Sequence, residues 1–270
     1  MRCLSTEKTT RITIDADSLR SQVRDKSVRV LDIRKEDDYK QNHILGAVNL
    51  PLANLLVDDS PQKVLQLTQS YGIDDETPVV VYDDTFGALA SRVAWTLQYI
   101  GHDDVSLLDI TYETWKKMGL ETSTDQVSYD KKTHSLKLKP EILATVDYLD
   151  IAKEKKDTIL VDNRERLNYL DNHIPGAINI PYRMLASTDN ILRPKEDLKK
   201  LIQNRNIQPN AEIITYCGSV GTLSGLGYYA LKSIGMTNVK LYVRSFKEWK
   251  SLEKPTASQQ DANYWDLSAE

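Results

Sequence analysis

The residue in this sequence best suited to covalent chemistry is Cys217, which follows an apolar run and precedes glycine and small side chains. The run EIITY at 212–216 is typical of a buried strand, and the segment after the cysteine is typical of a turn that leads into a helix. Small residues let successive backbone N–H groups converge beside a helix N-terminus, where an anion is favoured. The sequence therefore predicts a nucleophilic cysteine in an anion-binding loop made of Gly218, Ser219, Val220, Gly221 and Thr222. The alternative is a buried structural cysteine, which is the commonest state of a free thiol.

The segment around the cysteine belongs to the second copy of an internal repeat. LDIRKEDDYKQNHILGAVNLP at 31–51 matches VDNRERLNYLDNHIPGAINIP at 161–181 with an offset of 130 (161 − 31). Further along, Tyr82 and Trp115 match Tyr216 and Trp249 with an offset of 134 (216 − 82). So many coincidences at two consistent offsets indicate a tandem duplication.

The first copy has an aspartate where the second has its cysteine. Under the offset of 134, Asp83 takes the place of Cys217. A carboxylate cannot act as a sulfur nucleophile or hold a persulfide. We therefore expect the first half to be catalytically silent and the second half to do the chemistry.

Both copies alternate short apolar runs with segments of helical spacing. The alternation predicts an α/β fold in two domains, each a mostly parallel sheet flanked by helices, which places Cys217 at the carboxyl edge of a sheet. We expect domains at 8–122 and 140–254, a polar linker at 123–139 and a tail at 255–270. The expected strands are 28–33, 47–50, 78–82, 105–109, 158–162, 177–180, 212–216 and 239–243, and the expected helices are 15–25, 36–43, 61–72, 87–101 and 112–119.

Composition excludes several classes of protein. With 40% hydrophobic and 27% charged residues, the 270-residue chain is neither disordered nor low-complexity. A net charge of −4 argues against nucleic acid as a partner, and no apolar stretch reaches the roughly 20 residues that cross a bilayer. The N-terminus lacks the apolar run of a signal peptide, and Cys3 and Cys217 alone make neither a disulfide framework nor a thiolate zinc site. We expect a cytoplasmic protein that binds no membrane, no nucleic acid and no metal.

Taken together, these motifs resemble the tandem-domain sulfurtransferases, the rhodanese and 3-mercaptopyruvate sulfurtransferase family. The resemblance rests on the paired Asp-x-Arg and His-Ile-x-Gly-Ala blocks and on a cysteine loop in the second copy only. It implies that Cys217 takes a sulfane sulfur from thiosulfate or 3-mercaptopyruvate, becomes a persulfide and passes the sulfur to cyanide or a thiol. Such a reaction has a small anionic donor and needs no metal or organic cofactor.

The resemblance also implies helpers for the cysteine. The loop begins Cys-Gly-Ser, as in the mercaptopyruvate enzymes, in which a serine is proposed to work with a histidine and an aspartate of the first domain. The matching residues here are Ser219, His43 and Asp32, which would form a proton relay. However, His173 occupies the same place in the second copy, so His43 has the alternative of a purely structural role.

The arginines depart from the family pattern. The family's donor-binding arginine falls at Asn168, and Arg166 is the nearest substitute. We hypothesise that Arg244, which follows the last strand at the same sheet edge as the cysteine loop, supplies the missing positive charge. Its alternative is a solvated surface arginine, and the motif residue Arg164 is expected to pair structurally.

Two other functions were compared with sulfur transfer. Phosphatases of this fold need an arginine six residues after the cysteine, where this chain has Leu223, so a phosphatase is disfavoured. A non-catalytic persulfide carrier or binding module, loaded by a partner protein, stays open. Turnover with small donors alone would separate the carrier from the enzyme.

Overall fold

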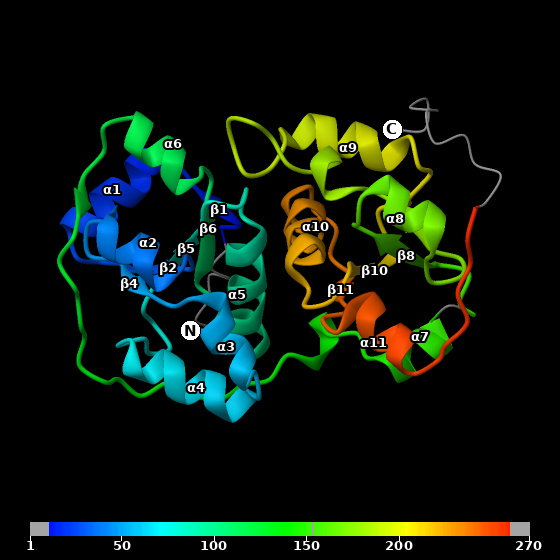
Figure 1. The fold of residues 1–270 in the computed structure, drawn as a ribbon, viewed down its shortest axis with the longest axis horizontal. Coiled ribbons are helices and arrows are strands. Elements are labelled where there is room, and N and C mark those ends of the chain that lie inside the picture. Colours follow the sequence, from blue (N-terminus) through cyan, green and yellow to red (C-terminus); the bar gives the residue numbers. More distant parts are fainter. Residues whose placement is uncertain (1–10, 153, 260–270) are drawn as a thin grey trace, which may run out of the picture.

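The computed structural model describes residues 11–152 and 154–259, which form two similar halves (Figure 1). In the first half the elements are β1 (Thr13–Ile14), α1 (Ala16–Arg24), β2 (Arg29–Asp32), α2 (Glu36–Gln41), β3 (His43–Ile44), β4 (Val48–Asn49), α3 (Leu52–Val57), α4 (Pro61–Ser70), β5 (Val79–Tyr82), α5 (Ala88–Tyr99), β6 (Val105–Leu108), α6 (Tyr112–Lys117) and β7 (Thr122–Ser123). In the second half they are η1 (Pro140–Ile142), α7 (Val146–Ala152), β8 (Thr158–Asp162), α8 (Arg166–Asp171), β9 (Ile178–Asn179), η2 (Tyr182–Met184), α9 (Lys195–Gln203), β10 (Glu212–Tyr216), α10 (Thr222–Ser233), β11 (Val239–Leu241) and α11 (Ser245–Ser251).

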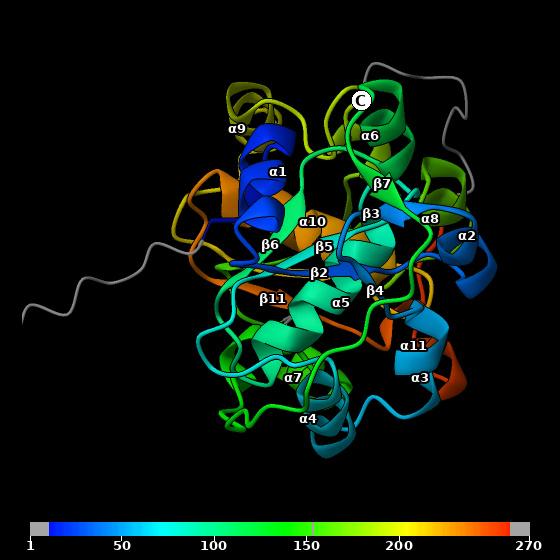
Figure 2. The ribbon, with the colours of Figure 1, turned by 90° about the vertical axis from the view of Figure 1, so that its left-hand side faces the viewer.

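Each half is built around a parallel sheet. The strand order is β1-β6-β5-β2-β4 in the first half and β11-β10-β8-β9 in the second, and every neighbouring pair is parallel. Helices cover the sheets, as Figure 2 shows for the first half. The predicted fold class, two tandem α/β domains with mostly parallel sheets, is confirmed. The central strands β5 and β10 end at Tyr82 and Tyr216, so the residues that follow them lie at equivalent sheet edges.

The two halves pack through α5 and α10, which lie side by side in the middle of Figure 1. Gly225 sits so close to α5 that an added Cβ would be 3.3 Å from the backbone nitrogen of Arg92 and 3.4 Å from Ser91. Ser91 and Gly225 are equivalent under the offset of 134, so the helices cross where the two copies are related by pseudo-two-fold symmetry. The hydroxyl of Tyr229 also reaches Gln98 across the crossing at 3.0 Å.

The segment between the halves does not hang free of the first domain. Thr122 and Ser123 form β7, which pairs antiparallel with β3. Neither of these two short strands was expected from the sequence. Tyr129 donates a hydrogen bond to the carbonyl of Gly46 at 3.0 Å, and the guanidinium of Arg29 lies 2.9 Å above its ring. These contacts could not be predicted from the polar composition of the segment, because they depend on backbone groups and on a few anchoring side chains.

A shorter segment plays the same part in the second half. Ala257 forms an antiparallel bridge with His173, as Ser123 does with His43 in the first half. Beyond residue 259 the expected tail lies outside the described residues. No helix in the two described ranges is long and apolar enough to cross a bilayer.

Candidate active site

Cys217 lies directly after β10 in a loop that turns into α10. Gly221 ends the turn with φ +76°, a conformation that glycine adopts without strain. The loop is held against the segment after β11, because Phe246 N–H donates to the carbonyl of Cys217 at 3.1 Å and Lys247 N–H donates to that of Gly218 at 2.9 Å. The cysteine is only 2% exposed. Its position at the carboxyl edge of a parallel sheet is the one expected from the sequence.

Ser245 is the side chain that holds the cysteine itself. The backbone N–H of Cys217 donates to Ser245 Oγ at 3.1 Å, and that oxygen lies 3.8 Å from Cys217 Sγ. The hydroxyl also lies 2.9 Å from the carbonyl of Tyr242. Sequence reasoning placed residues 242–246 at this sheet edge but did not single out Ser245, because a serine after a strand carries no signal of its own.

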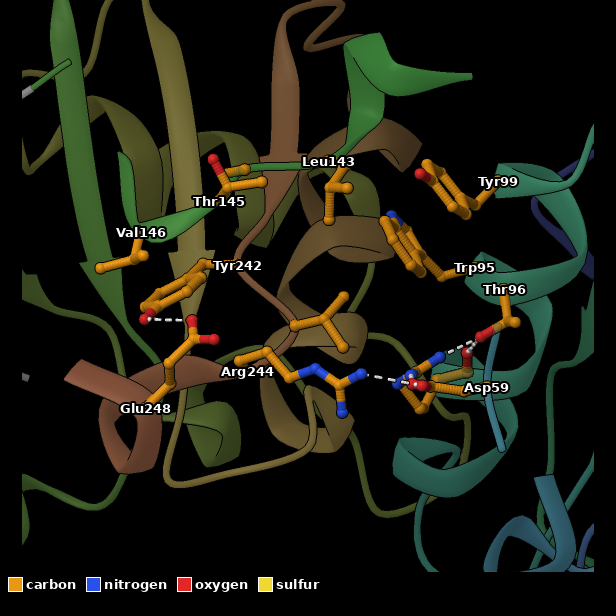
Figure 3. Close-up of a pocket in the computed structure, with 13 residues that line it drawn as sticks. Asp59, Trp95, Thr96, Tyr99, Leu143, Thr145, Val146, Tyr242, Arg244 and Glu248 are labelled. Carbon is orange, nitrogen blue, oxygen red and sulfur yellow. Dashed lines mark hydrogen bonds and ion pairs between the residues drawn. The ribbon is translucent and has the colours of Figure 1, made fainter. Parts of the chain in front are cut away.

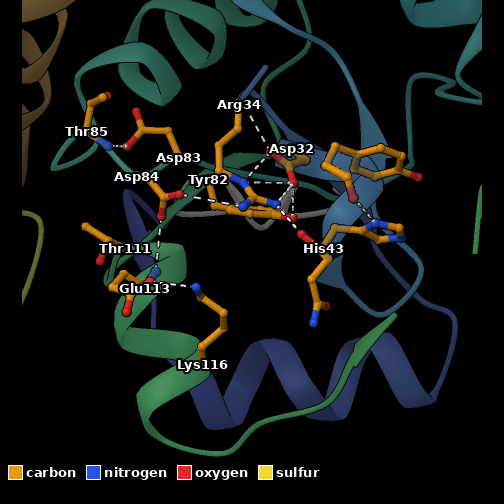
Figure 4. A network of polar contacts seen from close by, with 12 residues as sticks. Asp32, Arg34, His43, Tyr82, Asp83, Asp84, Thr85, Thr111, Glu113 and Lys116 are labelled. Atoms are coloured by element: carbon orange, nitrogen blue, oxygen red, sulfur yellow. Dashed lines mark hydrogen bonds and ion pairs between the residues drawn. The ribbon is translucent and has the colours of Figure 1, made fainter. Parts of the chain in front are cut away.

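The equivalent loop of the first half is occupied by its own side chain. Asp83 Oδ1 accepts hydrogen bonds from the N–H groups of Thr85 at 2.7 Å and Gly87 at 2.9 Å, and Oδ2 accepts one from Ala90 at 2.8 Å. Figure 4 shows Asp83 and Thr85 among the polar residues at this edge. Burial raises the pKa of Asp83, and the three N–H donors oppose that rise. The N–H groups of this loop thus form an anion-binding site, and the carboxylate of Asp83 occupies it.

The two loops begin and end alike but differ between those ends, because Phe86 has φ +48° whereas its equivalent, Val220, does not lie in the left-handed region. Gly87 ends the first with φ +81°, as Gly221 ends the second. Tyr112 N–H donates to the carbonyl of Asp83 at 3.1 Å, which is the contact that Phe246 makes with Cys217. The amides that correspond to those of Thr85, Gly87 and Ala90 are those of Ser219, Gly221 and Ser224. These amides are the candidates to bind an anion on Cys217.

The opposite domain covers each loop differently. Over the first loop, an added Cβ on Gly87 would lie 2.4 Å from Ile191, and Phe86 stacks on Tyr182 with ring centroids 4.9 Å apart. Over the cysteine loop, the nearest atom of the first domain to an added Cβ on Gly221 is Cδ of Arg92, at 3.4 Å. The silent loop is thus sealed by apolar groups, whereas the cysteine loop meets a guanidinium.

Arg92 is a site residue that sequence reasoning missed. Its Nε donates to the carbonyl of Val220 in the cysteine loop at 2.8 Å, and its Nη2 pairs with Asp59 at 2.8 Å. The side chain is 1% exposed, and burial lowers its pKa to about 10 although Asp59 and Cys217 act in the opposite direction. A usable signal was present, since Arg92 is the only charged residue in the segment 87–101.

The predicted relay residue His43 lies in a structural setting. Its Nδ1 is 2.8 Å from the carbonyl of Tyr39, its Nε2 is 3.0 Å from the carbonyl of Asp125, and its ring stacks on Tyr39. His173 repeats the arrangement in the second half, with Nδ1 2.7 Å from the carbonyl of Tyr169 and the rings stacked. Both histidines therefore tie a helix to a strand.

Asp32, the other relay residue, is bound by neighbours in its own domain. Its carboxylate accepts hydrogen bonds from Arg34 at 2.5 to 3.1 Å and from the hydroxyl of Tyr82 at 2.5 Å (Figure 4). Asp162 and Arg164 form the same pair in the second half, which confirms the structural pairing expected of Arg164. Among the described residues, neither Asp32 nor His43 makes a hydrogen bond to the other or to the cysteine loop, so the relay stays a prediction that this geometry does not support.

The two predicted donor-binding arginines lie in different settings. Arg244 is 59% exposed and pairs with Asp59 at 2.8 Å (Figure 3). It stands beside the cysteine loop because its neighbour Ser245 accepts a hydrogen bond from the N–H of Cys217. Arg166 begins α8, and its buried Nε has no hydrogen-bond partner in residues 11–152 and 154–259. Within the same residues, no cluster of three or more histidine, cysteine or acidic side chains is arranged to hold a metal ion.

Comparisons with known proteins agree with this architecture. The family described as the Rhodanese-like domain matches residues 15–118 and 145–252. The sulfur carrier protein TtuD of Thermus thermophilus is 26% identical over 89% of this chain and 94% of its own, and a probable 3-mercaptopyruvate sulfurtransferase of Schizosaccharomyces pombe is 32% identical over 65% and 64%. The structure of the Escherichia coli 3-mercaptopyruvate sulfotransferase SseA superposes with a TM-score of 0.78 at 24% identity, over 88% of this chain and 99% of that one. The duplicated sequence, the paired parallel sheets and the two matched segments together show that this chain belongs to the rhodanese family, with two copies of its domain in tandem.

Proposed function

We propose that this protein is a sulfurtransferase that moves a sulfane sulfur from thiosulfate or 3-mercaptopyruvate to cyanide or a thiol through a persulfide on Cys217. With thiosulfate, the thiolate attacks the outer sulfur, the S–S bond breaks and sulfite leaves. With 3-mercaptopyruvate, the C–S bond breaks, the thiol proton ends on carbon and pyruvate leaves. Both routes leave Cys–S–S⁻, which an acceptor thiolate or cyanide then attacks to regenerate Cys217.

The observation that carries this proposal is the way Asp83 fills its loop. A carboxylate oxygen is two bonds from Cβ, and so is the outer sulfur of a cysteine persulfide. Three backbone N–H groups bind the oxygens of Asp83 at 2.7 to 2.9 Å. The cysteine loop leads into its helix through an equivalent glycine, and we assign its corresponding amides the same role toward the persulfide anion. The carboxylate oxygens of Asp83 take the position that the outer sulfur of a persulfide would take. Because this position is filled, the first half is proposed to be catalytically inactive.

The relatives support the same class of reaction. Their names include a sulfur carrier protein, putative thiosulfate sulfurtransferases and a probable 3-mercaptopyruvate sulfurtransferase. The loop sequence Cys-Gly-Ser favours 3-mercaptopyruvate, and thiosulfate stays open as a donor. The chemistry requires Cys217 in its reduced form, so we propose a reducing, cytoplasmic setting.

Two assignments around the cysteine belong to this proposal as well. Arg244 is the predicted donor-binding arginine that stands beside the loop, so we assign it to the anionic group of the donor. Ser219, half-buried in the loop, is the nearest of the three predicted relay residues to the sulfur in sequence. A proton reaching the carbon of the leaving pyruvate would come through Ser219 or water if the His43 ring keeps its two carbonyl partners.

A persulfide carrier is the second candidate. The observation that favours it is Asn168, which stands where the family has its donor-binding arginine, so the site lacks one charge for holding a free anionic donor. The Thermus thermophilus relative is also named a sulfur carrier. A carrier would be loaded by a partner protein and would show no turnover with small donors.

Steady-state sulfur transfer tests the proposal. Thiosulfate and 3-mercaptopyruvate are compared as donors, cyanide and a dithiol as acceptors, and Cys217→Ser is the control. Turnover that disappears in Cys217→Ser supports the enzyme, and the larger kcat/KM identifies the donor. If both donors fail while a protein persulfide adds one sulfur to Cys217, as seen by mass spectrometry, the carrier is correct. Absence of both turnover and loading would contradict both functions.

A further inference from the structure

Three charged side chains from the two domains meet beside the cysteine loop. Asp59 lies between α3 and α4 of the first domain, and its two oxygens accept hydrogen bonds from different arginines. Oδ2 is 2.8 Å from Nη2 of Arg92, and Oδ1 is 2.8 Å from Nη2 of Arg244 (Figure 3). One carboxylate is therefore shared between an arginine of each domain. Two guanidinium groups that converge on one carboxylate make a site with the shape and charge to bind a carboxylate.

This site adjoins the reacting sulfur. Nε of Arg92 donates a hydrogen bond to the carbonyl of Val220, which lies in the cysteine loop three residues after Cys217. Arg244 directly precedes Ser245, whose hydroxyl lies 3.8 Å from Cys217 Sγ. The arginine pair thus lies beside the loop that carries Cys217, with Arg92 bonded to the loop itself.

The arginines and Asp59 line a pocket of about 230 Å³ between the domains. Its other walls are mainly apolar and aromatic, with Trp95, Leu143 and Tyr242 among them (Figure 3). Trp95 is 3% exposed, and its Nε1–H has no hydrogen-bond acceptor among the described residues. This donor is itself shielded from the pocket, so Trp95 contributes an apolar ring face to the wall. Apolar walls and two guanidinium groups suit a small organic anion better than an inorganic one.

Asp59 is held less firmly than the arginine beneath it. Arg92 is buried, and a buried charge needs an anionic partner. Arg244 is 59% exposed, and exposed ion pairs contribute about 0 to 1 kcal/mol. Asp59 lies in the short connection between α3 and α4, and its side chain is 15% exposed, so its carboxylate can be reached from solvent. An incoming carboxylate could therefore replace Asp59 while Arg92 keeps an anionic partner throughout.

We propose that Arg92 and Arg244 form the binding site for the carboxylate of an organic sulfur donor, and that Asp59 occupies this site until the donor displaces it. The inference rests on the proposed sulfurtransferase function and names its donor as a small carboxylate. Asp59 thereby sets specificity, because only an anion that binds the arginines better than the tethered aspartate gains access. The apolar wall selects a carbon body over a sulfur oxyanion.

The experiment compares Asp59→Asn with Asp58→Asn, its exposed neighbour in the same connection, in the full chain carrying Cys217→Ser. Calorimetric titrations with pyruvate and with sulfate are made at constant ionic strength. We expect Asp59→Asn to bind pyruvate about 10-fold more tightly than Asp58→Asn or the parent, with a smaller gain for sulfate. Adding Arg244→Gln to Asp59→Asn should remove the gain. Equal binding by the two aspartate variants, a gain that survives Arg244→Gln, or an equal gain for sulfate would overturn the proposal.

If loss of Asp59 prevents folding, Arg244→Gln alone gives the answer. This exposed side chain can be replaced without disturbing the core, and the pyruvate Kd is expected to rise about 10-fold. An unchanged Kd would overturn the proposal.

These titrations require no turnover, so they are independent of the proposed function. Tighter pyruvate binding by Asp59→Asn in a protein without sulfur transfer would keep the site and remove the enzyme. Sulfur transfer by the wild type together with unchanged pyruvate binding in Asp59→Asn would keep the proposed enzyme and reject the proposed carboxylate site.

Discussion

In the first half of the molecule, the loop after β5 is filled by the carboxylate of Asp83, and in the second half the same loop carries the thiol of Cys217. The first is covered by Ile191 and by the stack of Phe86 on Tyr182, and the second by Arg92. The duplication therefore kept the ends of one loop and varied its occupant, its cover and the backbone at Phe86 and Val220. The difference teaches that two loops at equivalent sheet edges can differ in function, because the residue inside each loop and the residues that cover it are different.

Cys217→Asp is the variant that turns the working loop into a copy of the silent one. We expect sulfur transfer to fall at least about 1,000-fold, as in other enzymes that lose their nucleophile. At pH 7 the variant should be at least as stable to urea as Cys217→Ala, because its carboxylate can accept hydrogen bonds from the loop amides. If Cys217→Asp is clearly less stable than Cys217→Ala, the amides of the two loops do not converge in the same way.

Asp83→Ala tests the comparison from the other side. Three buried N–H groups would lose their acceptor, which should lower the free energy of unfolding by about 3 kcal/mol or more. Urea denaturation measures the loss, and Asp83→Asn, which keeps one oxygen, should lose less. An unchanged free energy of unfolding in Asp83→Ala would show that these three hydrogen bonds do not hold the silent loop.

Arg92→Leu gives α5 the residue that stands at the equivalent position of α10, Leu226, and so replaces the charged cover of the cysteine loop by an apolar one. The variant loses the hydrogen bond to Val220 and leaves Asp59 without its buried partner. We expect kcat/KM for 3-mercaptopyruvate to fall about 10- to 100-fold, since hydrogen bonds from charged groups contribute about 1.5 to 3 kcal/mol. Arg92→Lys, which keeps the charge but not the Nε donor, should lie between the two. Wild-type kinetics in Arg92→Leu would show that the cover of the loop does not matter.

We expect the first domain to lose stability at a higher pH than the second when the protein is acidified. Burial lowers the pKa of both His102 and His134, whose rings lie 5.2 Å apart in the first domain. Below the unfolded-state pKa of about 6.5 the unfolded chain binds protons that the folded chain does not, so stability present above that pH is lost as the pH falls. Hydrogen exchange between pH 7 and 5 should therefore show earlier loss of protection in the first domain than in the second. His134→Gln should reduce that loss, and equal loss in both halves would count against the histidine pair.

The smallest effect is expected from the paired histidines of the repeat. His43→Gln and His173→Gln remove the same contact in each half, so their kcat values should agree within about threefold. A much larger fall in His43→Gln would instead establish the predicted proton relay. The thermal stability of both variants, measured in parallel, controls for damage to the fold.

The sequence predicted the fold well because the repeat shows each element twice. The strand that ends at Tyr82 and the strand that ends at Tyr216 are equivalent, so each supports the prediction of the other. The position of the cysteine loop, directly after Tyr216, is predicted from them. β7 was missed because a two-residue strand in a polar segment has no hydrophobic period. Strand pairing there depends on what lies opposite, which is β3.

The site was predicted where chemistry and position coincide, and missed where two distant segments meet. Cys217 and Arg244 follow strands of one domain, so the rules for a parallel sheet place both at one edge. Arg92 and Asp59 come from the other domain and reach the loop only because α5 crosses α10. No spacing within the chain encodes that crossing, although a lone arginine in an apolar helix is a usable sign.

The close approach of α5 and α10 at Gly225 extends the region in which substitutions alter sulfur chemistry. A methyl group at this position would press on the backbone of Arg92 at 3.3 Å, so alanine would force the helices apart by a few tenths of an ångström. Since Arg92 also holds the carbonyl of Val220, that widening would pass directly to the loop that carries the thiol. The absence of a side chain at Gly225 thus sets the spacing between the two helices, and a larger residue there would shift the cysteine loop without changing any residue that touches Cys217.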